Sequence, residues 1–287
     1  MGLTDSQVAT LKLKAQQIRR KTIETVVWAG GGHLGGALSQ VEIMVLLYYH
    51  FLNIDPKRPD WADRDRVVLS KGHGGIGYAP LLADRGYFSE GLLEEFNHTG
   101  SPFGMHLDRL KVPGVDASTG SLGHGLPMAV GMALGARLKG AAWRTYCILG
   151  DGECNEGSVW EAAMAAAHFR LDTLTALIDR NGLCIDGTTE AIMALEPLAD
   201  KWRAFGWEVT AVDGHDFREL AGAIEAARRS TGRPTAIIAR TVKGKGVDFM
   251  EDQAAWHYGG LDSERAALAL QSIDRRSDTA GPGRRAP

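Results

Sequence analysis

Residues 145–240 alternate short apolar runs with helical patterns, and this alternation limits the possible folds more than any other feature. The apolar runs, which we expect to be strands, are TYCILG (145–150), LTALIDR (174–180), WEVTAVDG (207–214) and PTAIIAR (234–240). Helices are expected between them, over residues 157–169, 196–205 and 216–229. Uninterrupted apolar strands that alternate with helices are typical of a parallel sheet that is buried on both faces. The sequence therefore predicts an α/β fold, a parallel β-sheet with helices on both faces.

The N-terminal part adds one strand and three helices to this pattern. RVVLS (66–70) is a short apolar strand candidate, and the helices are expected over residues 5–29, 39–51 and 122–138. The chain shows no internal repeat and no clear linker, so we expect one domain over residues 1–272. Residues 273–287 are polar and rich in Pro and Gly, and we expect them to form a disordered tail.

Glycine is unusually frequent, with 36 residues, and much of it gathers in five clusters. These clusters are GGGHLGG (30–36), KGHGGIG (71–77), TGSLGHG (119–125), GDGECNEG (150–157) and VKGKG (242–246). Glycine permits sharp turns and lets a ligand approach the backbone closely. Several of the clusters follow strand candidates, and parallel sheets of this kind bind ligands at the carboxyl ends of their strands. We therefore expect these loops to converge on one extended ligand, although any single cluster could be an ordinary tight turn.

The turn GDGECNEG combines glycines with three carboxylates, Asp151, Glu153 and Glu156. A glycine turn before a helix favours phosphate, whereas carboxylates repel it. A hard divalent cation such as Mg²⁺ or Ca²⁺ would resolve the conflict, because it takes oxygen ligands and commonly joins a carboxylate to a bound di- or triphosphate. Asn181, after the next strand, could supply an amide oxygen, and Glu153 is expected to be solvated. The alternative is that these acids only form caps and turns, and the residues alone leave both interpretations open.

The composition excludes several classes of function. The chain has 44% hydrophobic and 23% charged residues and a net charge of −3, which gives no electrostatic case for nucleic acid or an anionic membrane as a partner. No apolar stretch approaches the roughly 20 residues that span a bilayer, and the N-terminus is polar and not signal-like. The three cysteines form no CxxC pair, and their odd number argues against a disulfide framework. A reducing cytoplasm is the expected location.

Six blocks of the sequence, taken in order, resemble transketolases over about residues 10–265. GDGECNEG with the later DRNGLCIDG (179–187) resembles the thiamine diphosphate fingerprint, which is GDG followed at a distance by N. The other blocks are GGHLGGALSQVEIMVLLYY, LSKGHGGIGYAPLLADRGYF, PGVDASTGSLGHGLPMAVGMALGARL, VWEAAMAAAHFRLD and VKGKGVDFMEDQAAWHY. One GDG match would be weak evidence, whereas six ordered blocks are strong evidence.

The resemblance implies a thiamine diphosphate-binding fold of the diphosphate-binding (PP) type, with thiamine diphosphate and Mg²⁺ or Ca²⁺ as cofactors. It assigns the metal to Asp151, Asn181 and the carbonyl of Leu183. The implied cofactor contacts are His73, Gly120, Ser121, Leu122, Gly150, Asp151, Gly152, Glu156 and Asn181. Within this set, Glu156 resembles the acid that communicates with an activating glutamate of the partner chain. Glu161 is a further interface candidate.

Four of the nine histidines stand where transketolases place active-site histidines, and they are His33, His73, His106 and His257. Cleavage of the carbon–carbon bond of a ketose needs proton removal from a hydroxyl, for which imidazole is well matched near neutral pH. The resemblance makes His33 and His257 candidates for deprotonating and aligning the donor hydroxyl. It places His73 beside the diphosphate and the reaction centre, and His106 beside the terminal hydroxymethyl group of the substrate.

The other histidines are expected to be surface or turn residues, namely His50, His98, His168 and His215. His124 stands where relatives commonly have glutamine, and Leu34 where GHPG is usual. These two departures leave the substrate specificity open, more than the binding of the cofactor. Zinc binding by the histidines is the alternative, but the chain has neither HExxH nor Cys/His spacing.

A full-length transketolase is about twice as long and has further domains, which 287 residues cannot accommodate. The resemblance therefore implies a split enzyme, in which a separate C-terminal, pyrimidine-domain subunit supplies the activating glutamate, in an α2β2 assembly. The expected reaction is transfer of a two-carbon ketol unit from a ketose phosphate to an aldose phosphate or to a carrier-bound thiol or lipoyl acceptor.

Two other functions remain open at this point. One is a decarboxylating 2-oxoacid carboligase or the first component of a dehydrogenase, against which the four-histidine set argues. The other is a cofactor-binding regulatory partner without turnover, which would have no physical need for Asp151, Asn181 and the histidines.

Overall fold

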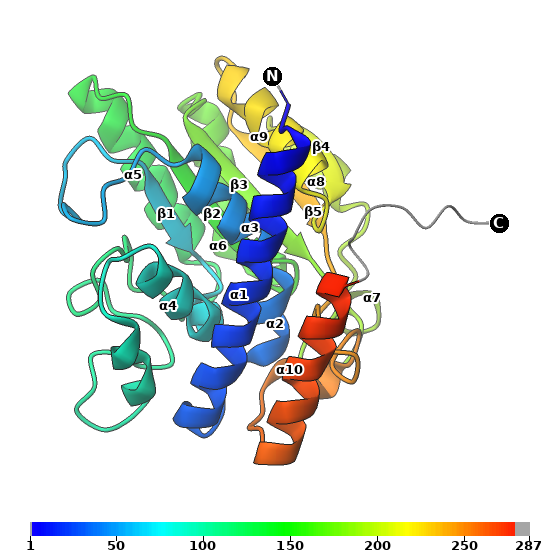
Figure 1. The fold of residues 1–287 in the computed structure, drawn as a ribbon. Helices are drawn as coiled ribbons and strands as arrows, with labels where there is room; N and C mark the ends of the chain where they lie inside the picture. The colour runs from blue at the N-terminus through cyan, green and yellow to red at the C-terminus, as the bar shows by residue number, and fades with distance from the viewer. Residues whose placement is uncertain (1, 279–287) are drawn as a thin grey trace.

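The computed structural model describes residues 2–278 and contains a five-stranded sheet in the strand order β1-β2-β3-β5-β4 (Figure 1). The strands are β1 (Arg66–Leu69), β2 (Thr145–Gly150), β3 (Leu174–Arg180), β4 (Glu208–Asp213) and β5 (Thr235–Arg240). Every pairing between neighbours is parallel. All five strands lie where the apolar runs predicted them, so the predicted α/β fold is confirmed.

The register of the sheet brings the ends of three strands to one edge. Gly150 at the end of β2 pairs with Asp179 of β3, and Arg180 of β3 pairs with Arg240 at the end of β5. The loops after these strands therefore start side by side, as the sequence predicted for GDGECNEG, DRNG and VKGKG.

Helices connect the strands and cover both faces of the sheet (Figure 1). The α-helices are α1 (Asp5–Ala29), α2 (Leu34–Ser39), α3 (Val41–Leu46), α4 (Gly75–Asp84), α5 (Gly125–Lys139), α6 (Gly157–His168), α7 (Thr189–Ile192), α8 (Leu198–Ala204), α9 (Phe217–Arg229) and α10 (Ser263–Asp278). Shorter elements are a π-helical turn, η1 (Leu47–Phe51), and the 3₁₀ turns η2 (Gly72–Gly74), η3 (Glu90–Glu95), η4 (Gly152–Asn155) and η5 (Ala254–His257).

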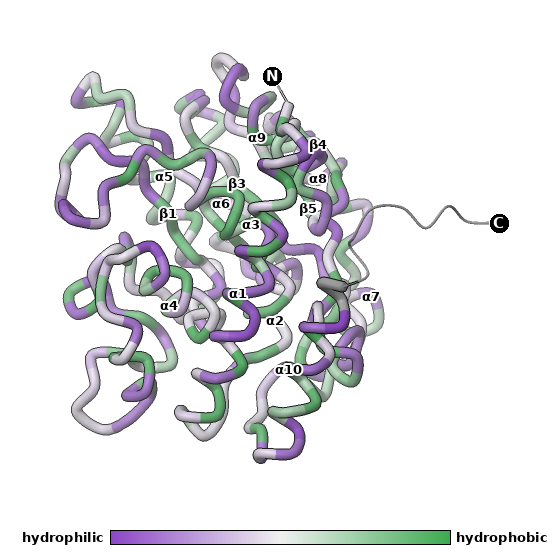
Figure 2. The backbone as a smooth tube through the Cα atoms, in the orientation of Figure 1, coloured by the Kyte–Doolittle hydropathy of each residue, from purple (hydrophilic) through white to green (hydrophobic). Residues whose placement is uncertain are grey.

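Alternate side chains of the strands enter two separate hydrophobic clusters, one on each face of the sheet. In β2, Tyr146 and Ile148 belong to the cluster that includes residues of α1, α3, α4 and α9, whereas Cys147 and Leu149 belong to the cluster of α5, α6 and α8. This is the period of two that a strand buried on both faces requires. Figure 2 shows the central strands as hydrophobic along their length, with hydrophilic segments at the periphery.

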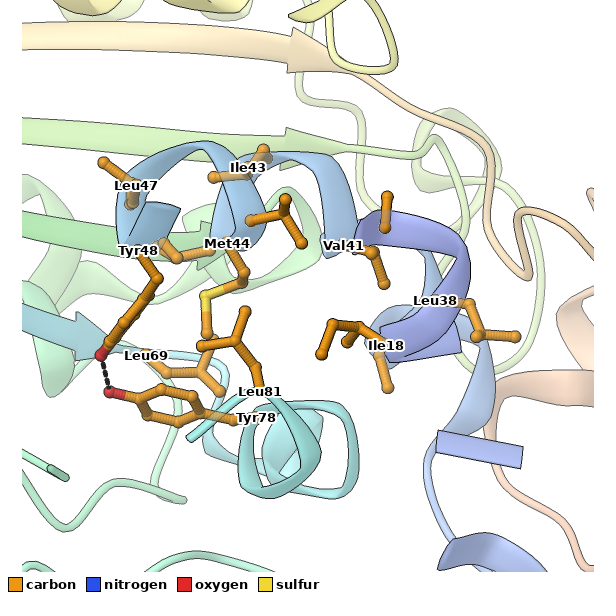
Figure 3. Close-up of a cluster of buried hydrophobic side chains, with 14 of the residues drawn as sticks. Ile18, Leu38, Val41, Ile43, Met44, Leu47, Tyr48, Leu69, Tyr78 and Leu81 are labelled. Carbon is orange, nitrogen blue, oxygen red and sulfur yellow. Dashed lines mark hydrogen bonds between the residues drawn. The ribbon is translucent and has the colours of Figure 1, made fainter. Parts of the chain in front are cut away.

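The larger cluster fills the space between α1, α3 and α4 (Figure 3). Met44 and Leu81 meet at its centre, and Ile18 of α1 packs beside them; all three are at most 2% exposed. Tyr48 and Tyr78 are also buried, and one hydrogen bond joins their hydroxyl groups. Burial of a large aliphatic side chain contributes about 1.5–3 kcal/mol, so this cluster anchors the N-terminal helices to the sheet.

The N-terminal helix α1 is defined at both ends by its sequence. Thr4 and Gln7 form a reciprocal capping box, and Gly30 ends the helix with φ of 71°. The predicted helix over 39–51 is instead divided into the end of α2, α3 and the π-helical turn η1. None of the described helices has the length and hydropathy that a bilayer span requires.

The C-terminal helix α10 lies alongside α1 (Figure 1). Arg20 of α1 pairs with Asp274 of α10 at 2.6 Å, and Ile273 is 3% exposed within the core. The predicted disordered tail is therefore wrong in its first part, because residues 273–278 continue the helix α10. The prediction rested on the polar, Pro- and Gly-rich composition of residues 273–287 as a whole, and this average hid the helical residues 273–278. Residues 279–287 of the predicted tail lie outside the described residues.

Candidate active site

A cavity of about 390 Å³ lies at the edge where β1, β2, β3 and β5 end, and it collects most of the residues predicted for the site. Members of the predicted set that line it are His33, His73, His106, Gly120, Leu122, Gly150, Asp151, Gly152, Asn181, Leu183 and His257. Four of the five glycine clusters contribute residues to this set. The fifth, VKGKG, contributes Lys243 to the lining of the cavity. The predicted convergence of the glycine loops is therefore what the structure shows.

Asp151 begins the turn after β2, and its side chain is held by the backbone. Its Oδ1 accepts a hydrogen bond from the Gly152 N–H at 2.8 Å, and its Oδ2 accepts one from the Gly182 N–H at 2.7 Å. Burial raises the pKa of the Asp151 carboxyl, and nearby Asp179 raises it further, whereas the hydrogen bonds oppose the shift. A buried carboxylate of this kind favours a nearby cation.

Arg180 supplies one such cation in the structure. Its Nη1 donates to Asp151 Oδ2 at 3.0 Å and to Thr189 Oγ1 at 2.7 Å, and its Nη2 pairs with Glu190 and Glu196. Arg180 thereby connects the acidic turn to the segment that follows the predicted metal loop. Arg180 is part of DRNGLCIDG, but the resemblance assigned it no role.

Asn181 and Leu183 lie in the loop after β3, next to Asp151. Asn181 Oδ1 accepts a hydrogen bond from the Leu183 N–H at 3.1 Å, and the Leu183 carbonyl accepts one from Lys243 Nζ at 3.1 Å. Lys243 Nζ also contacts the Cys184 carbonyl at 3.0 Å and His257 Nδ1 at 3.0 Å. Burial lowers the pKa of Lys243 to about 8. The loops after β3 and β5 are thus joined through one lysine.

The donor chemistry of this loop suits the predicted metal ligands. Asp151, Asn181 and the Leu183 carbonyl are all oxygen donors. Asp151 Oδ1, Asn181 Oδ1 and the Leu183 oxygen each accept one hydrogen bond, and an oxygen of this kind has two lone pairs, so each keeps room for another partner, whereas Asp151 Oδ2 already accepts from Gly182 and Arg180. Hard cations such as Mg²⁺ and Ca²⁺ use this donor set. The described residues contain no group of three or more His, Cys, Asp or Glu side chains that could hold a metal, so a softer, all-side-chain site is not supported. The residues present fit a hard cation next to a phosphate.

Lys71 and Asp179 form a buried ion pair beneath the cavity. The Lys71 side chain is 2% exposed and the Asp179 side chain 0%, and the ammonium also donates to the Gly36 carbonyl at 2.7 Å. Ser39 donates to Asp179 at 2.5 Å, and Thr241 donates to its other oxygen. Burial opposes ionisation, but the Lys71 charge and these donors together lower the pKa of Asp179. The pair joins the loop after β1 to β3 and, through Gly36 and Ser39, to α2.

Glu153 corrects the expectation that this acid is solvated, since it is 2% exposed. Its carboxylate accepts hydrogen bonds from the Gly123 N–H at 2.8 Å, the Gly150 N–H at 3.1 Å and the Ser70 hydroxyl. Burial raises the pKa of this carboxyl, and the three donors oppose the shift. Glu153 therefore holds together three of the loops that form the site. Its position in a polar glycine turn gave no sign of burial.

Three of the four predicted histidines form a triangle over the cavity. The ring centroids are 5.0 Å apart for His33 and His73, 5.3 Å for His33 and His257, and 5.4 Å for His73 and His257. Burial lowers the pKa of all three, to about 2 for His73 and about 4 for His257, and adjacent positive charges add to the shift. All three imidazoles are therefore neutral at pH 7.

The hydrogen bond from Lys243 also decides the tautomer of His257. An ammonium group has three donors and no acceptor, so Nδ1 of His257 accepts and the ring proton lies on Nε2. His33 differs, because its Nδ1 is buried and has no partner among the described residues. His257 is consequently a donor toward the cavity, whereas His33 keeps a nitrogen that can accept.

The remaining predicted residues lie around the rim. His106 is exposed, and its ring packs against Gly120, where an added Cβ would lie 3.0 Å from His106 Cδ2. Ser121 is exposed, and it lines no part of the cavity described above. Glu156 and Glu161 are exposed at the start of α6 and along its length, as a role in contacting another chain would require.

Among the other histidines, His50, His98 and His168 are exposed, as expected, and so is His124. His215 lies in the turn after β4, as the expectation of a surface or turn residue allows, but it is not exposed. Its side chain is 14% exposed, and both of its nitrogens are hydrogen-bonded, to Glu42 and to the Val242 N–H.

Comparisons with known proteins agree with this fold. The family profile described as "Transketolase, thiamine diphosphate binding domain" matches residues 10–274. The 6-deoxy-6-sulfo-D-fructose transketolase subunit SqwG of Clostridium sp. (strain MSTE9) is 45% identical over 269 residues, 94% of this chain and 98% of that protein. An apulose-4-phosphate transketolase subunit of Phocaeicola vulgatus is 39% identical over 270 residues, 94% of this chain and 96% of that protein.

Solved structures give the same class. The crystal structure of transketolase from Campylobacter jejuni subsp. jejuni NCTC 11168 superposes with a TM-score of 0.87 at 30% identity, covering 92% of this chain. The match covers only 42% of that transketolase. The fold and site therefore define a thiamine diphosphate-binding domain of the transketolase type. The chain belongs to the family of transketolase thiamine diphosphate-binding domains, and the resemblance drawn from the sequence is confirmed.

Proposed function

We propose that this chain is the diphosphate-binding subunit of a two-component, thiamine diphosphate-dependent transketolase. The observation that carries the proposal is the cavity at the carboxyl ends of the strands, in which an oxygen-donor set faces a triangle of neutral histidines. An oxygen-donor set suits a divalent cation with a diphosphate, and neutral imidazoles suit proton transfer at substrate hydroxyls. A cofactor-binding regulatory partner without turnover would need the oxygen donors but not the histidine triangle.

The cofactor diphosphate and its metal would be held by the loops after β2 and β3. Asp151, Asn181 and the Leu183 carbonyl are the proposed ligands of Mg²⁺, and Gly150 and Gly152 would let the backbone approach the diphosphate. A Cβ on Gly152 would lie 3.0 Å from Cys184 Sγ, so a side chain at this position would press on the loop after β3. When bound, thiamine diphosphate supplies the nucleophilic carbon that attacks the carbonyl of the ketose.

The histidines would act on the hydroxyls of the sugar. His33, which lines the cavity and has a pKa lowered by burial, is the proposed acceptor of the proton from the donor hydroxyl. His257, whose Nδ1 is occupied by Lys243, would donate from Nε2 to a substrate oxygen and align it. His73 would lie next to the diphosphate, and the exposed His106 would contact the far end of the sugar.

The partner is proposed from the relatives that have the same extent as this chain. Two relatives named as transketolase subunits are covered over 98% and 96% of their length. By analogy, a separate pyrimidine-domain subunit would complete the cofactor site, in an α2β2 assembly, with the exposed Glu156 and Glu161 toward that subunit. The donor would be a ketose with an anionic end group, and the acceptor an aldose phosphate or a carrier-bound group.

The proposal is tested by a donor screen with the chain and its pyrimidine-domain subunit mixed, in the presence of thiamine diphosphate and Mg²⁺. The donors are xylulose 5-phosphate, a sulfonated ketose and apulose 4-phosphate, each with an aldose phosphate acceptor. The second and third are chosen because the two relatives are named for 6-deoxy-6-sulfo-D-fructose and for apulose 4-phosphate. Pyruvate is the control for the decarboxylating alternative. We expect ketol transfer from at least one ketose and no release of carbon dioxide from pyruvate; turnover of pyruvate alone would overturn the proposal.

A further inference from the structure

The loop after β5, Val242–Gly246, carries Lys243 into the active site, and we refer to it as the lysine loop. Lys243 Nζ makes three contacts there, to the Leu183 and Cys184 carbonyls and to His257 Nδ1. Two glycines of the loop have left-handed backbones, with φ of 76° at Gly244 and 98° at Gly246. A loop of this composition needs contacts from outside to hold one conformation.

Two buried side chains hold the lysine loop at its two ends. The Val242 N–H donates to His215 Nε2 at 2.9 Å, and Arg19 Nε donates to the Lys245 carbonyl at 3.0 Å. Both contacts are to backbone groups, so they fix the path of the chain on either side of Lys243 and Gly244. His215 comes from the β4–α9 connection and Arg19 from α1, far from the loop in sequence.

Glu42 of α3 joins the two anchors. Its carboxylate accepts hydrogen bonds from Arg19 Nη1 at 2.7 Å, from Arg19 Nη2 at 2.6 Å and from His215 Nδ1 at 2.9 Å, and it is 6% exposed. Burial alone would raise the pKa of Glu42, but the Arg19 charge and the bond to His215 outweigh it and hold the pKa at about 2. The hub of the network therefore remains ionised at pH 7.

The network also decides the tautomer of His215. Because the backbone N–H of Val242 must donate, Nε2 of His215 accepts, and the ring proton lies on Nδ1 and points to Glu42. A buried ion pair is weak evidence for stability, because desolvation of both charges offsets their attraction. The network instead fixes two groups against the lysine loop. The Nε2 acceptor of His215 is held at the Val242 end, and the Nε–H donor of Arg19 is held at the Lys245 end.

We propose that Arg19, Glu42 and His215 form a clamp that positions the lysine loop, and through it Lys243, against the Leu183 carbonyl and His257. His215 is a positioning residue in this arrangement, since the path from it to the cavity runs through the backbone of Val242. The clamp itself rests on the contacts above. Its effect on cofactor binding and ketol transfer rests, in addition, on the proposed function.

Two substitutions of His215 separate the acceptor from the rest of the side chain. In His215→Gln, the amide oxygen reaches the position of Nε2 and can accept from the Val242 N–H. In His215→Asn, the shorter amide reaches only the position of Nδ1, so it can donate to Glu42 but leaves Val242 without an acceptor. Both variants remove the ring, so a general loss of packing would affect them alike.

The first readout is hydrogen exchange of the Val242 amide in the full chain, which requires neither partner nor activity. We expect His215→Asn to speed exchange by about tenfold or more, the effect of losing one partly buried hydrogen bond, and His215→Gln to stay within about threefold of the wild type. Equal exchange in wild type and His215→Asn, or equal acceleration in both variants, would overturn the clamp. If His215→Asn does not fold, Arg19→Lys keeps a charge beside Glu42 but lacks the Nε–H, and it should release the Lys245 end.

The second readout is thiamine diphosphate affinity and ketol transfer of the chain mixed with its pyrimidine-domain subunit. We expect about a tenfold weaker affinity in His215→Asn and a value near that of the wild type in His215→Gln. Faster exchange in His215→Asn with unchanged cofactor affinity and turnover would refute the link from the clamp to the active site. If even the wild type transfers no ketol unit, the proposed function fails, and the exchange experiment still decides the clamp.

Discussion

Replacement of Lys71 by methionine tests whether the buried pair beneath the site holds its loops together. Lys71→Met keeps most of the side-chain volume but leaves the Asp179 carboxylate, which is 0% exposed, without its cation. Removal of one partner of a buried pair costs about 3–5 kcal/mol. Asp179 keeps the hydroxyl donors Ser39 and Thr241, so we expect a loss of about 3 kcal/mol, at the lower end of this range.

The reverse substitution, Asp179→Asn, leaves the buried Lys71 ammonium without a counter-charge and with only neutral oxygen acceptors such as the Gly36 carbonyl, and we expect it to cost at least as much, about 3–5 kcal/mol. The double variant Lys71→Met with Asp179→Asn contains neither buried charge. Its loss should therefore be smaller than the two single losses combined, by a coupling free energy of about 2 kcal/mol or more.

The assay is urea unfolding of the chain, followed by far-UV circular dichroism, for the wild type and the three variants. Arg203→Met is the matched control, because Arg203 pairs with Asp200 at 2.7 Å but the two side chains are 53% and 70% exposed. An exposed pair of this kind contributes at most about 1 kcal/mol. A loss in Lys71→Met no larger than in the control, or a coupling free energy near zero, would refute the reasoning.

Three further predictions concern the site and its surroundings. Asp151→Asn removes the charge proposed for the metal, so Mg²⁺-dependent binding of thiamine diphosphate by the chain mixed with its partner should be lost in calorimetry; unchanged binding would exclude Asp151 as a ligand. His33→Ala should lower kcat of the mixed subunits by about 10²–10⁴-fold, as expected for a general base, and a smaller effect would assign proton removal elsewhere. Glu42 has a pKa of about 2 in the folded chain against an ordinary value of 4.5, so its stabilising effect is present above pH 4.5 and is lost as the pH falls toward 2. Glu42→Gln should therefore remove about 3 kcal/mol of the acid dependence seen in urea unfolding, and identical acid profiles would contradict the low pKa.

The strands could be predicted because they are buried on both faces. The run TYCILG became β2 with the expected bounds, since an uninterrupted apolar run has few alternatives in a parallel sheet. The edge that gathers GDGECNEG and DRNG followed from the same argument, because parallel strands end together. The histidine triangle, by contrast, came from the family resemblance, as nothing in the spacing of His33, His73 and His257 brings them together.

The buried polar groups could not be predicted, because their partners are distant in sequence. Lys71 meets Asp179 across 108 residues, and His215 meets Glu42 across 173. A charged residue in a glycine loop is normally solvated, which is why Glu153 was misjudged. The two lysines did carry a signal, since each stands in a glycine cluster directly after a strand, where its side chain can turn back over the end of the sheet.

The central claim is that the cofactor site is shared between this chain and a pyrimidine-domain subunit. The most direct test is a titration of a constant amount of the chain with that subunit, with thiamine diphosphate and Mg²⁺ in excess and a productive ketose and aldose phosphate present. We predict negligible ketol transfer by either chain alone and a rate that rises until the two are present in equal amounts. Robust ketol transfer by this chain alone would contradict the account.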